Sequence, residues 1–242
     1  MIRGASGWEL PIYVAHVKQG FEDRRVSIER QLGERRLEFE FMLDGDVADL
    51  SRERMDRWFS GQLAEASPKT SCACKHLLIW EAVVERGERA ALVLEDDALL
   101  SKDFVEVVEA AVAEMEREHR IDDPWFVSLE NSTLRFVPSK ERRPGQYLYP
   151  ASKGRCTGAY LMGDALARKM LEAAEGGGVD VPVDWYVDRW LERADVQPFW
   201  CEPTVVEQGS HAGVFATALG RPRTSWLHRV HWSVRKMFRR MK

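Results

Sequence analysis

Short apolar runs alternate along this chain with segments in which apolar residues recur at helical spacing. Nearly continuous apolar runs, typical of buried strands, occupy residues 10–17, 90–94, 125–129 and 157–162, and residues 37–42 alternate like a half-exposed strand. Helical periodicity predicts helices over residues 22–32, 76–86, 104–119, 164–174 and 184–193. This order predicts an α/β fold with a mostly parallel central sheet flanked by helices on both faces.

Polar and glycine-rich residues mark the expected boundaries of these elements. Thr70 and Ser71 are expected to cap the helix over 76–86, and Gly87 is expected to end it. Asp164 is expected to cap the helix that runs through residue 174. Residues 44–70 predict short helices and loops, and residues 135–150 predict a surface loop.

The composition indicates one packed domain followed by a basic tail. The chain has 242 residues, of which 45% are hydrophobic, and this length suits a single core. Its net charge of −4 hides an asymmetry, because residues 221–242 hold eight of the 35 basic residues and no acidic one. Residues 1–220 therefore carry 27 basic against 39 acidic residues, a net charge of −12. Such an acidic body does not indicate a nucleic-acid binder.

The basic tail has the pattern of a membrane-surface helix. Trp226, Val230, Val234, Met237 and Met241 recur every three or four residues, with arginines and lysines around them. A basic amphipathic helix of this kind lies in the interface of an anionic membrane. The alternatives are a helix packed on the acidic body and a disordered tail. We expect domains at 1–220 and 221–242, with the tail holding the protein peripherally on the inner face of the cytoplasmic membrane.

Neither the cysteines nor the first residues indicate export. The four cysteines fit no zinc motif, residues 1–10 lack an apolar signal core, and no stretch approaches the ~20 apolar residues of a membrane span. We therefore expect a cytoplasmic protein with free thiols.

Three consecutive carboxylates end the apolar run at residues 90–94. Glu95, Asp96 and Asp97 repel one another unless a cation or a basic group neutralises them. On an extended backbone Glu95 and Asp97 point to the same side and could hold one divalent ion. The alternative is a solvated acidic turn.

Several segments around this triplet, in order and spacing, resemble glycosyltransferase family 25, which includes lipooligosaccharide and collagen galactosyltransferases. The resemblance extends over most of residues 10–215. The matching segments are Pro11-Ile12-Tyr13-Val14, Asp23-Arg24, Phe39-Glu40-Phe41, Asp44-Gly45, Cys72-Ala73-Cys74-Lys75-His76, Leu94-Glu95-Asp96-Asp97, Thr157-Gly158-Ala159-Tyr160-Leu161 and Pro182-Val183-Asp184. The chain departs from the family pattern at His16, Ser71 and Lys75.

The resemblance implies a GT-A-like fold and a metal-dependent, inverting transfer of a sugar from a UDP-sugar donor, with UDP-galactose favoured, to a glycan or glycolipid acceptor such as lipooligosaccharide. It implies Mn²⁺ or Mg²⁺ as the cofactor. The expected metal ligands are Glu95, Asp97 and His211, the expected donor contacts are Arg24, Lys75, His76 and Asp96, and the expected general bases are Asp184 and then Asp188.

Each of these residues also has a purely structural interpretation. His76 could be a satisfied core histidine, Asp184 a helix cap, His211 a loop residue and Arg24 a solvated arginine. At the level of the whole protein, the alternative is a non-catalytic relative that binds sugar nucleotides or glycans. The intact acidic triplet argues against that alternative, because three adjacent carboxylates are costly to keep without a cation.

Overall fold

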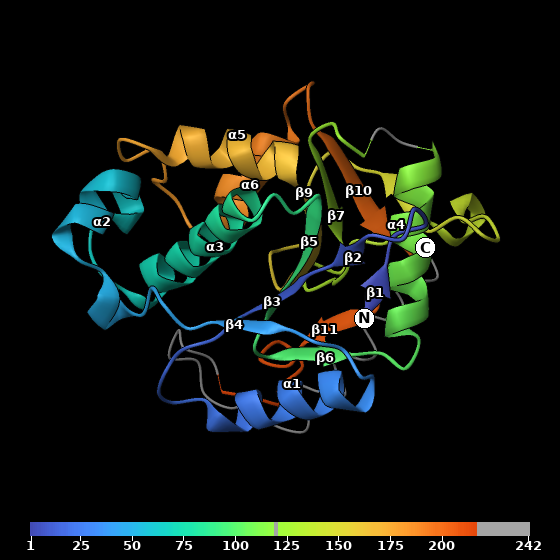
Figure 1. Cartoon of the computed structure of the whole chain (residues 1–242), viewed down its shortest axis with the longest axis horizontal. Helices are drawn as coiled ribbons and strands as arrows, with labels where there is room; N and C mark the ends of the chain where they lie inside the picture. The colour runs from blue at the N-terminus through green and yellow to red at the C-terminus, as the bar shows by residue number, and fades with distance from the viewer. Residues whose placement is uncertain (119–120, 217–242) are drawn as a thin grey trace.

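A seven-stranded sheet forms the centre of the molecule (Figure 1). The computed structural model describes residues 1–118 and 121–216. The strand order in the described part is β4-β3-β5-β9-β7-β10-β8. The strands are β3 (Ile12–Ala15), β4 (Glu40–Met42), β5 (Ala90–Glu95), β7 (Trp125–Ser128), β8 (Leu148–Pro150), β9 (Ala159–Gly163) and β10 (Gln197–Cys201).

The sheet is mixed but mostly parallel. Within the described residues, β4, β3, β5, β7 and β10 run in one direction, and β9 and β8 run in the other. The predicted α/β class and mostly parallel sheet are therefore confirmed. The strand predicted at 157–162 forms, but it lies antiparallel between β5 and β7. The carboxyl ends of the five codirectional strands meet at one edge, which is where ligands bind in open α/β sheets.

Helices cover both faces of the sheet, as predicted (Figure 1). One face packs against α1 (Glu22–Glu34) and α4 (Phe104–Glu118). The other packs against α3 (Pro68–Glu85), α5 (Asp164–Ala174) and α6 (Val183–Leu191). We call these the α1/α4 face and the α3/α5/α6 face.

Strand β5 contributes to both cores. Leu92 and Leu94 point into the α1/α4 face, while Ala91 and Val93 point into the α3/α5/α6 face, and all four are at most 1% exposed. A strand buried on both sides needs apolar residues at every position, so its sequence is a continuous apolar run. The run stops at Glu95 because the strand there reaches the edge of the sheet.

Two helix starts differ from the prediction. Helix α3 begins at Pro68, and Ser67 caps it by accepting from the Thr70 amide at 3.2 Å. Thr70 and Ser71 are therefore buried inside the helix, so their predicted capping role is wrong. Asp164 is the first residue of α5, after Gly163 at the cap, and its side chain pairs with Arg168 at 3.0 Å instead.

Short elements complete the described fold. Strands β1 (Ile2–Arg3) and β2 (Glu9–Leu10) form a hairpin, and β6 (Ala98–Leu100) pairs antiparallel with β11 (Val206–Gln208). The segment predicted as short helices and loops, 44–70, contains α2 (Arg52–Trp58) and the 3₁₀ turns Val47–Asp49 and Gly61–Leu63. The predicted surface loop, 135–150, contains the 3₁₀ turn Ser139–Glu141 and ends in strand β8. The β6–β11 pair matters for function because it brings the turn after β11 against the acidic triplet.

The predicted tail, 221–242, and its boundary at residue 220 lie outside the described residues. Within the part of the chain that is described, no helix combines the length and the apolar character needed to cross a membrane.

Candidate active site

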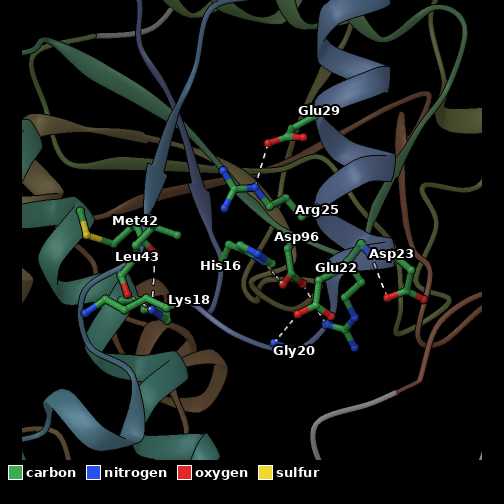
Figure 2. Close-up of polar contacts among 12 residues, drawn as sticks. His16, Lys18, Gly20, Glu22, Asp23, Arg25, Glu29, Met42, Leu43 and Asp96 are labelled. Atoms are coloured by element: carbon green, nitrogen blue, oxygen red, sulfur yellow. Dashed lines mark hydrogen bonds and ion pairs between the residues drawn. The ribbon is translucent and has the colours of Figure 1, made fainter.

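The acidic triplet lies at the carboxyl end of β5, and its middle residue is turned away from the other two. Asp96 is 6% exposed. Its Oδ2 lies 2.7 Å from His16 Nδ1, just after β3, and its Oδ1 accepts from Arg24 Nη1 of α1 at 2.8 Å. Figure 2 shows His16 and Asp96 together below the sheet edge. Asp96 therefore ties β3 and α1 to the end of β5.

Arg24, expected to contact the donor, is committed to this cluster. Its second guanidinium nitrogen donates to the carbonyl of Ala216, and its Cζ lies 4.2 Å from the centroid of the Phe21 ring. The side chain is buried. Arg24 is thus not a solvated arginine; it neutralises Asp96 and holds the residues after β11 close to α1.

Asp97 is buried with one oxygen unsatisfied. The side chain is 2% exposed, and Oδ2 accepts from the amide of Ser210 at 3.0 Å. Oδ1 has no hydrogen-bond partner within the described ranges. Burial, followed by the nearby charge of Glu95, raises the pKa of Asp97 to about 6. An unpaired buried carboxylate oxygen is costly, and a cation at this position would remove that cost.

Glu95 is the exposed member of the triplet and faces α3. Its Oε1 lies 3.7 Å from His76 Nε2 and 3.5 Å from the Thr157 hydroxyl that precedes β9. Ligand atoms of Cys72, His76 and Glu95 all lie within 4.8 Å of one another. The side chain is about a quarter exposed, at 27%, so it is the carboxylate of the triplet that a ligand reaches first.

His76 is oriented toward Glu95 by a buried chain of hydrogen bonds. Trp80 Nε1 donates to the Tyr160 hydroxyl at 2.9 Å, and that hydroxyl lies 2.8 Å from His76 Nδ1. Because the indole can only donate, the phenolic proton is free to go to Nδ1, which leaves the imidazole proton on Nε2 facing Glu95. His76 is fully buried, and its Nε2, 3.7 Å from Glu95, has no hydrogen-bond partner among the described residues.

Glu130 is a site residue that the sequence analysis missed. It follows β7 by two residues and is fully buried. Its Oε2 accepts from the amide and hydroxyl of Ser132, both at 2.6 Å, while Oε1 has no partner in the described structure. Burial, with smaller contributions from Glu95 and Asp97, raises its pKa to about 8. The sequence could have indicated this residue, because Glu130 directly follows the strand predicted over 125–129.

Asp184 and Asp188, the two expected bases, differ in what they contact. Asp184 lies in the first turn of α6, and Pro182, which makes no side-chain capping bond, is at the cap position. Its Oδ2 lies 3.9 Å from Cys156 Sγ, and burial raises its pKa. Asp188 Oδ1 accepts from the amide of Gly154 at 2.8 Å. Asp184 is thus the less committed of the two.

Lys75 contacts the segment after β4, and His211 lies in the turn beside Asp97. The Lys75 ammonium contacts the carbonyls of Leu43 and Asp44 at 2.8 and 3.0 Å and the carboxylate of Asp46 at 2.8 Å. With three donors used, Lys75 fastens α3 to the segment after β4. His211 is exposed in the turn that follows Ser210, whose amide donates to Asp97.

Comparison with known proteins identifies the family. The sequence profile described as glycosyltransferase family 25 (LPS biosynthesis protein) matches residues 10–187. The chain belongs to glycosyltransferase family 25. The match covers β3 through most of α6, and therefore the triplet, His76, Glu130 and Asp184.

One curated protein and one solved structure show weaker similarity to this family member. A Haemophilus influenzae protein named "Putative glycosyltransferase" is 25% identical over 173 residues, which are 67% of this chain and 57% of that protein. The chain thus spans under two thirds of that relative's length. A Bacillus anthracis structure named "Putative Glucose-1-Phosphate Thymidylyltransferase", in complex with a sucrose, aligns over 78% of this chain and 66% of that one, at 14% identity and a TM-score of 0.34. That score is too low to establish a common fold.

The donor atoms of this family 25 site fit a hard divalent cation. Asp97 Oδ1 is a buried carboxylate oxygen without a partner among the residues described, and carboxylate oxygens are the ligands that Mg²⁺ and Mn²⁺ prefer. The group of Cys72, His76 and Glu95 would suit Zn²⁺ if the thiol were ionised. Burial raises the pKa of the Cys72 thiol well above its usual range in the metal-free protein.

Proposed function

We propose that this family 25 glycosyltransferase has a GT-A-like, metal-dependent site and transfers a sugar with inversion from a UDP-sugar, with UDP-galactose as the first candidate, to a bacterial surface glycan such as lipooligosaccharide. The family description, which refers to lipopolysaccharide biosynthesis, supports the acceptor class. The position of the triplet at the carboxyl end of a central strand supports a nucleotide-sugar site.

One observation carries the metal dependence. Asp97 is buried, is destabilised as an anion by Glu95, and has an oxygen without a partner among the described residues. Glu95 and Asp97 would hold the ion, and His211 in the turn beside Asp97 is the proposed third ligand. A bound Mn²⁺ or Mg²⁺ would supply the positive charge that stabilises the departing diphosphate.

Asp184 is the proposed general base. Its carboxylate would take the proton from an acceptor hydroxyl while that oxygen bonds to the anomeric carbon of the donor sugar. The bond from that carbon to the diphosphate oxygen breaks in the same step, and UDP leaves. Burial raises the pKa of Asp184, which brings it closer to neutral pH, where a base is most effective. Asp188 would instead fix the segment at Gly154.

Asp96, Arg24 and His76 have supporting roles in this proposal. Asp96 and Arg24 neutralise each other and hold α1 against the strand ends, where a UDP donor would lie. His76 orients Glu95 through its Nε2. These contacts would let Glu95 and Asp97 stay in place when the donor is absent, which reduces the reorganisation needed on binding.

The proposed place of work is the inner face of the cytoplasmic membrane. The support is the sequence of residues 221–242, with eight basic residues around an apolar stripe. Each basic residue near an anionic surface contributes about 1 kcal/mol before screening. A lipid-linked acceptor at that surface would then be close to the site.

The decisive experiment measures UDP release from a panel of UDP-sugars by the full chain, with Mn²⁺, with Mg²⁺ and with EDTA. Hydrolysis of one UDP-sugar that requires the ion is expected. Asp97→Asn should lower it by orders of magnitude and weaken Mn²⁺ binding in calorimetry, while Asp122→Asn, an exposed acid paired with Arg89, should match the parent. Full activity of the parent in EDTA would overturn the metal role. Binding of UDP-sugars without any turnover would favour the non-catalytic alternative.

A further inference from the structure

A second site lies at the β8–β10 edge of the sheet, on the α3/α5/α6 face. Strands β8 and β10 form its edge, and residues of the loop over 137–146 line an open cavity of ≈ 540 Å³ beside them. Small-molecule sites typically measure about 300–1,000 Å³. Trp200 and Tyr149 are directly opposite each other on the two strands and both line this cavity.

The Trp200 indole is held in place before any ligand arrives. Its Nε1 donates to the carbonyl of Lys153 at 2.7 Å, and the Arg155 guanidinium carbon lies 4.6 Å from its ring centroid. Arg155 is itself fully buried and fixed by the carboxylate of Glu202 and the carbonyl of Cys201. A fixed aromatic ring binds a ligand at little cost in conformational entropy.

The rest of the lining combines Val137, Pro138 and Pro150 with four polar residues, two of which are cations. Lys140 and Arg143 line the cavity and are exposed, and neither side chain has an ion-pair partner among the residues described. Glu141 and Gln146 add one carboxylate and one amide. Aromatic surface with amide and carboxylate groups suits sugar rings and hydroxyls, while the two cations suit a phosphate or carboxylate substituent.

The cavity and the proposed base are connected by one segment, residues 153–157, on the same face of the sheet. The carbonyl of Lys153 holds Trp200, Cys156 lies beside Asp184, and Thr157 contacts Glu95. Strand β10, which carries Trp200, lies three strands from β5, and Trp200 is at the level of Val93, two residues before Glu95. At ~4.8 Å per strand and ~3.3 Å per residue, the separation is about 16 Å, the length of roughly three hexose units.

We propose that this cavity is a distal acceptor subsite, which holds an anionic oligosaccharide by a sugar about three units from the hydroxyl that is glycosylated. The inference rests on the proposed function, because it assigns the acceptor of that transfer. It identifies the acceptor class as a chain of at least three to four sugars with a phosphate or carboxylate substituent away from the reacting end.

The test uses the full chain, Mn²⁺ and the donor identified above, with acceptors of one to five sugars that are phosphorylated, carboxylated or neutral. Lys140→Ala/Arg143→Ala should raise the KM of long anionic acceptors at least tenfold, since each lost charge-assisted hydrogen bond contributes about tenfold. Its KM for monosaccharides and its donor hydrolysis should not change. Trp200→Phe should raise the KM of long acceptors, charged or neutral.

Matched controls separate the possible outcomes. Lys102→Ala/Arg117→Ala removes the same charge from the two ends of α4, on the opposite face of the sheet, and should behave like the parent. Binding of phosphorylated, carboxylated and neutral oligosaccharides can be measured directly by titration with tryptophan fluorescence as the signal. The parent, but not the Lys140→Ala/Arg143→Ala variant, should bind the charged oligosaccharides more tightly than the neutral ones. The charged oligosaccharide that binds more tightly identifies the preferred anion. If the parent hydrolyses the donor but acceptor length and charge leave KM unchanged, the subsite is overturned; absence of donor hydrolysis would instead overturn the proposed function.

Discussion

Glu130→Gln should make the metal-free protein more stable at alkaline pH and leave its stability at pH 5 nearly unchanged. Glutamine keeps the size of the side chain, and its carbonyl can accept the two hydrogen bonds from Ser132. What the substitution removes is the ability to ionise. The side chain is fully buried, so its charge has no access to solvent.

The magnitude follows from the difference in proton affinity between the two states. The pKa of Glu130 is raised from its ordinary 4.5 to about 8 in the folded protein. Between these values the folded state holds a proton that the unfolded state has lost, so the free energy of unfolding falls as pH rises. At ~1.36 kcal/mol per pH unit, the loss reaches about 5 kcal/mol above pH 8. The variant lacks this loss.

The assay is thermal and chemical unfolding of parent and variant in EDTA, at half-unit steps from pH 5 to pH 8.5. A gain of about 5 kcal/mol corresponds to a rise of roughly 10–20 °C in Tm for a protein of this size. Asp97 also titrates, with a pKa of about 6, and it does so in both proteins. Glu109→Gln, on the exposed side of α4, is the control. Mn²⁺ should reduce the difference, because a cation beside Glu95 and Asp97 offsets the repulsion on Glu130.

Parallel stability profiles for parent and Glu130→Gln would refute this reasoning. They would mean that the carboxyl group is ionised without cost, and therefore that solvent or a basic group reaches Oε1. A variant that is less stable than the parent at every pH would mean that the glutamine amide clashes in the position of that oxygen.

Three further predictions concern the proposed base, the buried hydrogen bonds of Tyr160 and the C-terminal tail. Asp184→Asn should lower turnover by about 10²–10⁴-fold with donor affinity unchanged in calorimetry, and a product anomer of retained configuration would exclude the single displacement. Tyr160→Phe should lower the free energy of unfolding, measured in urea, by about 2–4 kcal/mol, because Trp80 Nε1 and His76 Nδ1 lose their hydrogen-bond partner. An unchanged free energy would show that neither atom depends on the hydroxyl. The full chain should co-sediment with anionic vesicles at low salt while a 1–220 truncation stays in solution and keeps donor hydrolysis, and equal behaviour of the two would exclude the tail as an anchor.

The local parts of this site could be predicted from the sequence. A continuous apolar run predicts a strand buried on both faces, and the acids that follow it then lie at the strand's carboxyl end. The run at 90–94 and the triplet at 95–97 needed no other segment to be recognised. Helical periodicity likewise predicted α4 and α5 closely, because each helix carries its own apolar stripe.

Strand direction was decided by the tertiary structure. The apolar run that forms β9 is compatible with either direction, and β9 lies antiparallel between β5 and β7. Strand β10 joins the sheet beyond β7 although its sequence, with Pro198 and Trp200, gave no clear strand pattern. Pairing partners, not local propensity, place such strands.

The tertiary structure also decided what each charged side chain contacts. Asp96 contacts His16 and Arg24, which precede it by 80 and 72 positions in the chain. Lys75 contacts the carbonyl of Leu43 and the carboxylate of Asp46. Both side chains therefore have partners within the protein. Glu130 joins the site only because β7 ends at the same edge as β5. The sequence by itself determines which residues end a buried strand. Which of their oxygens stay unpaired depends on burial and on partners distant in the chain, and these exist only once the sheet has assembled.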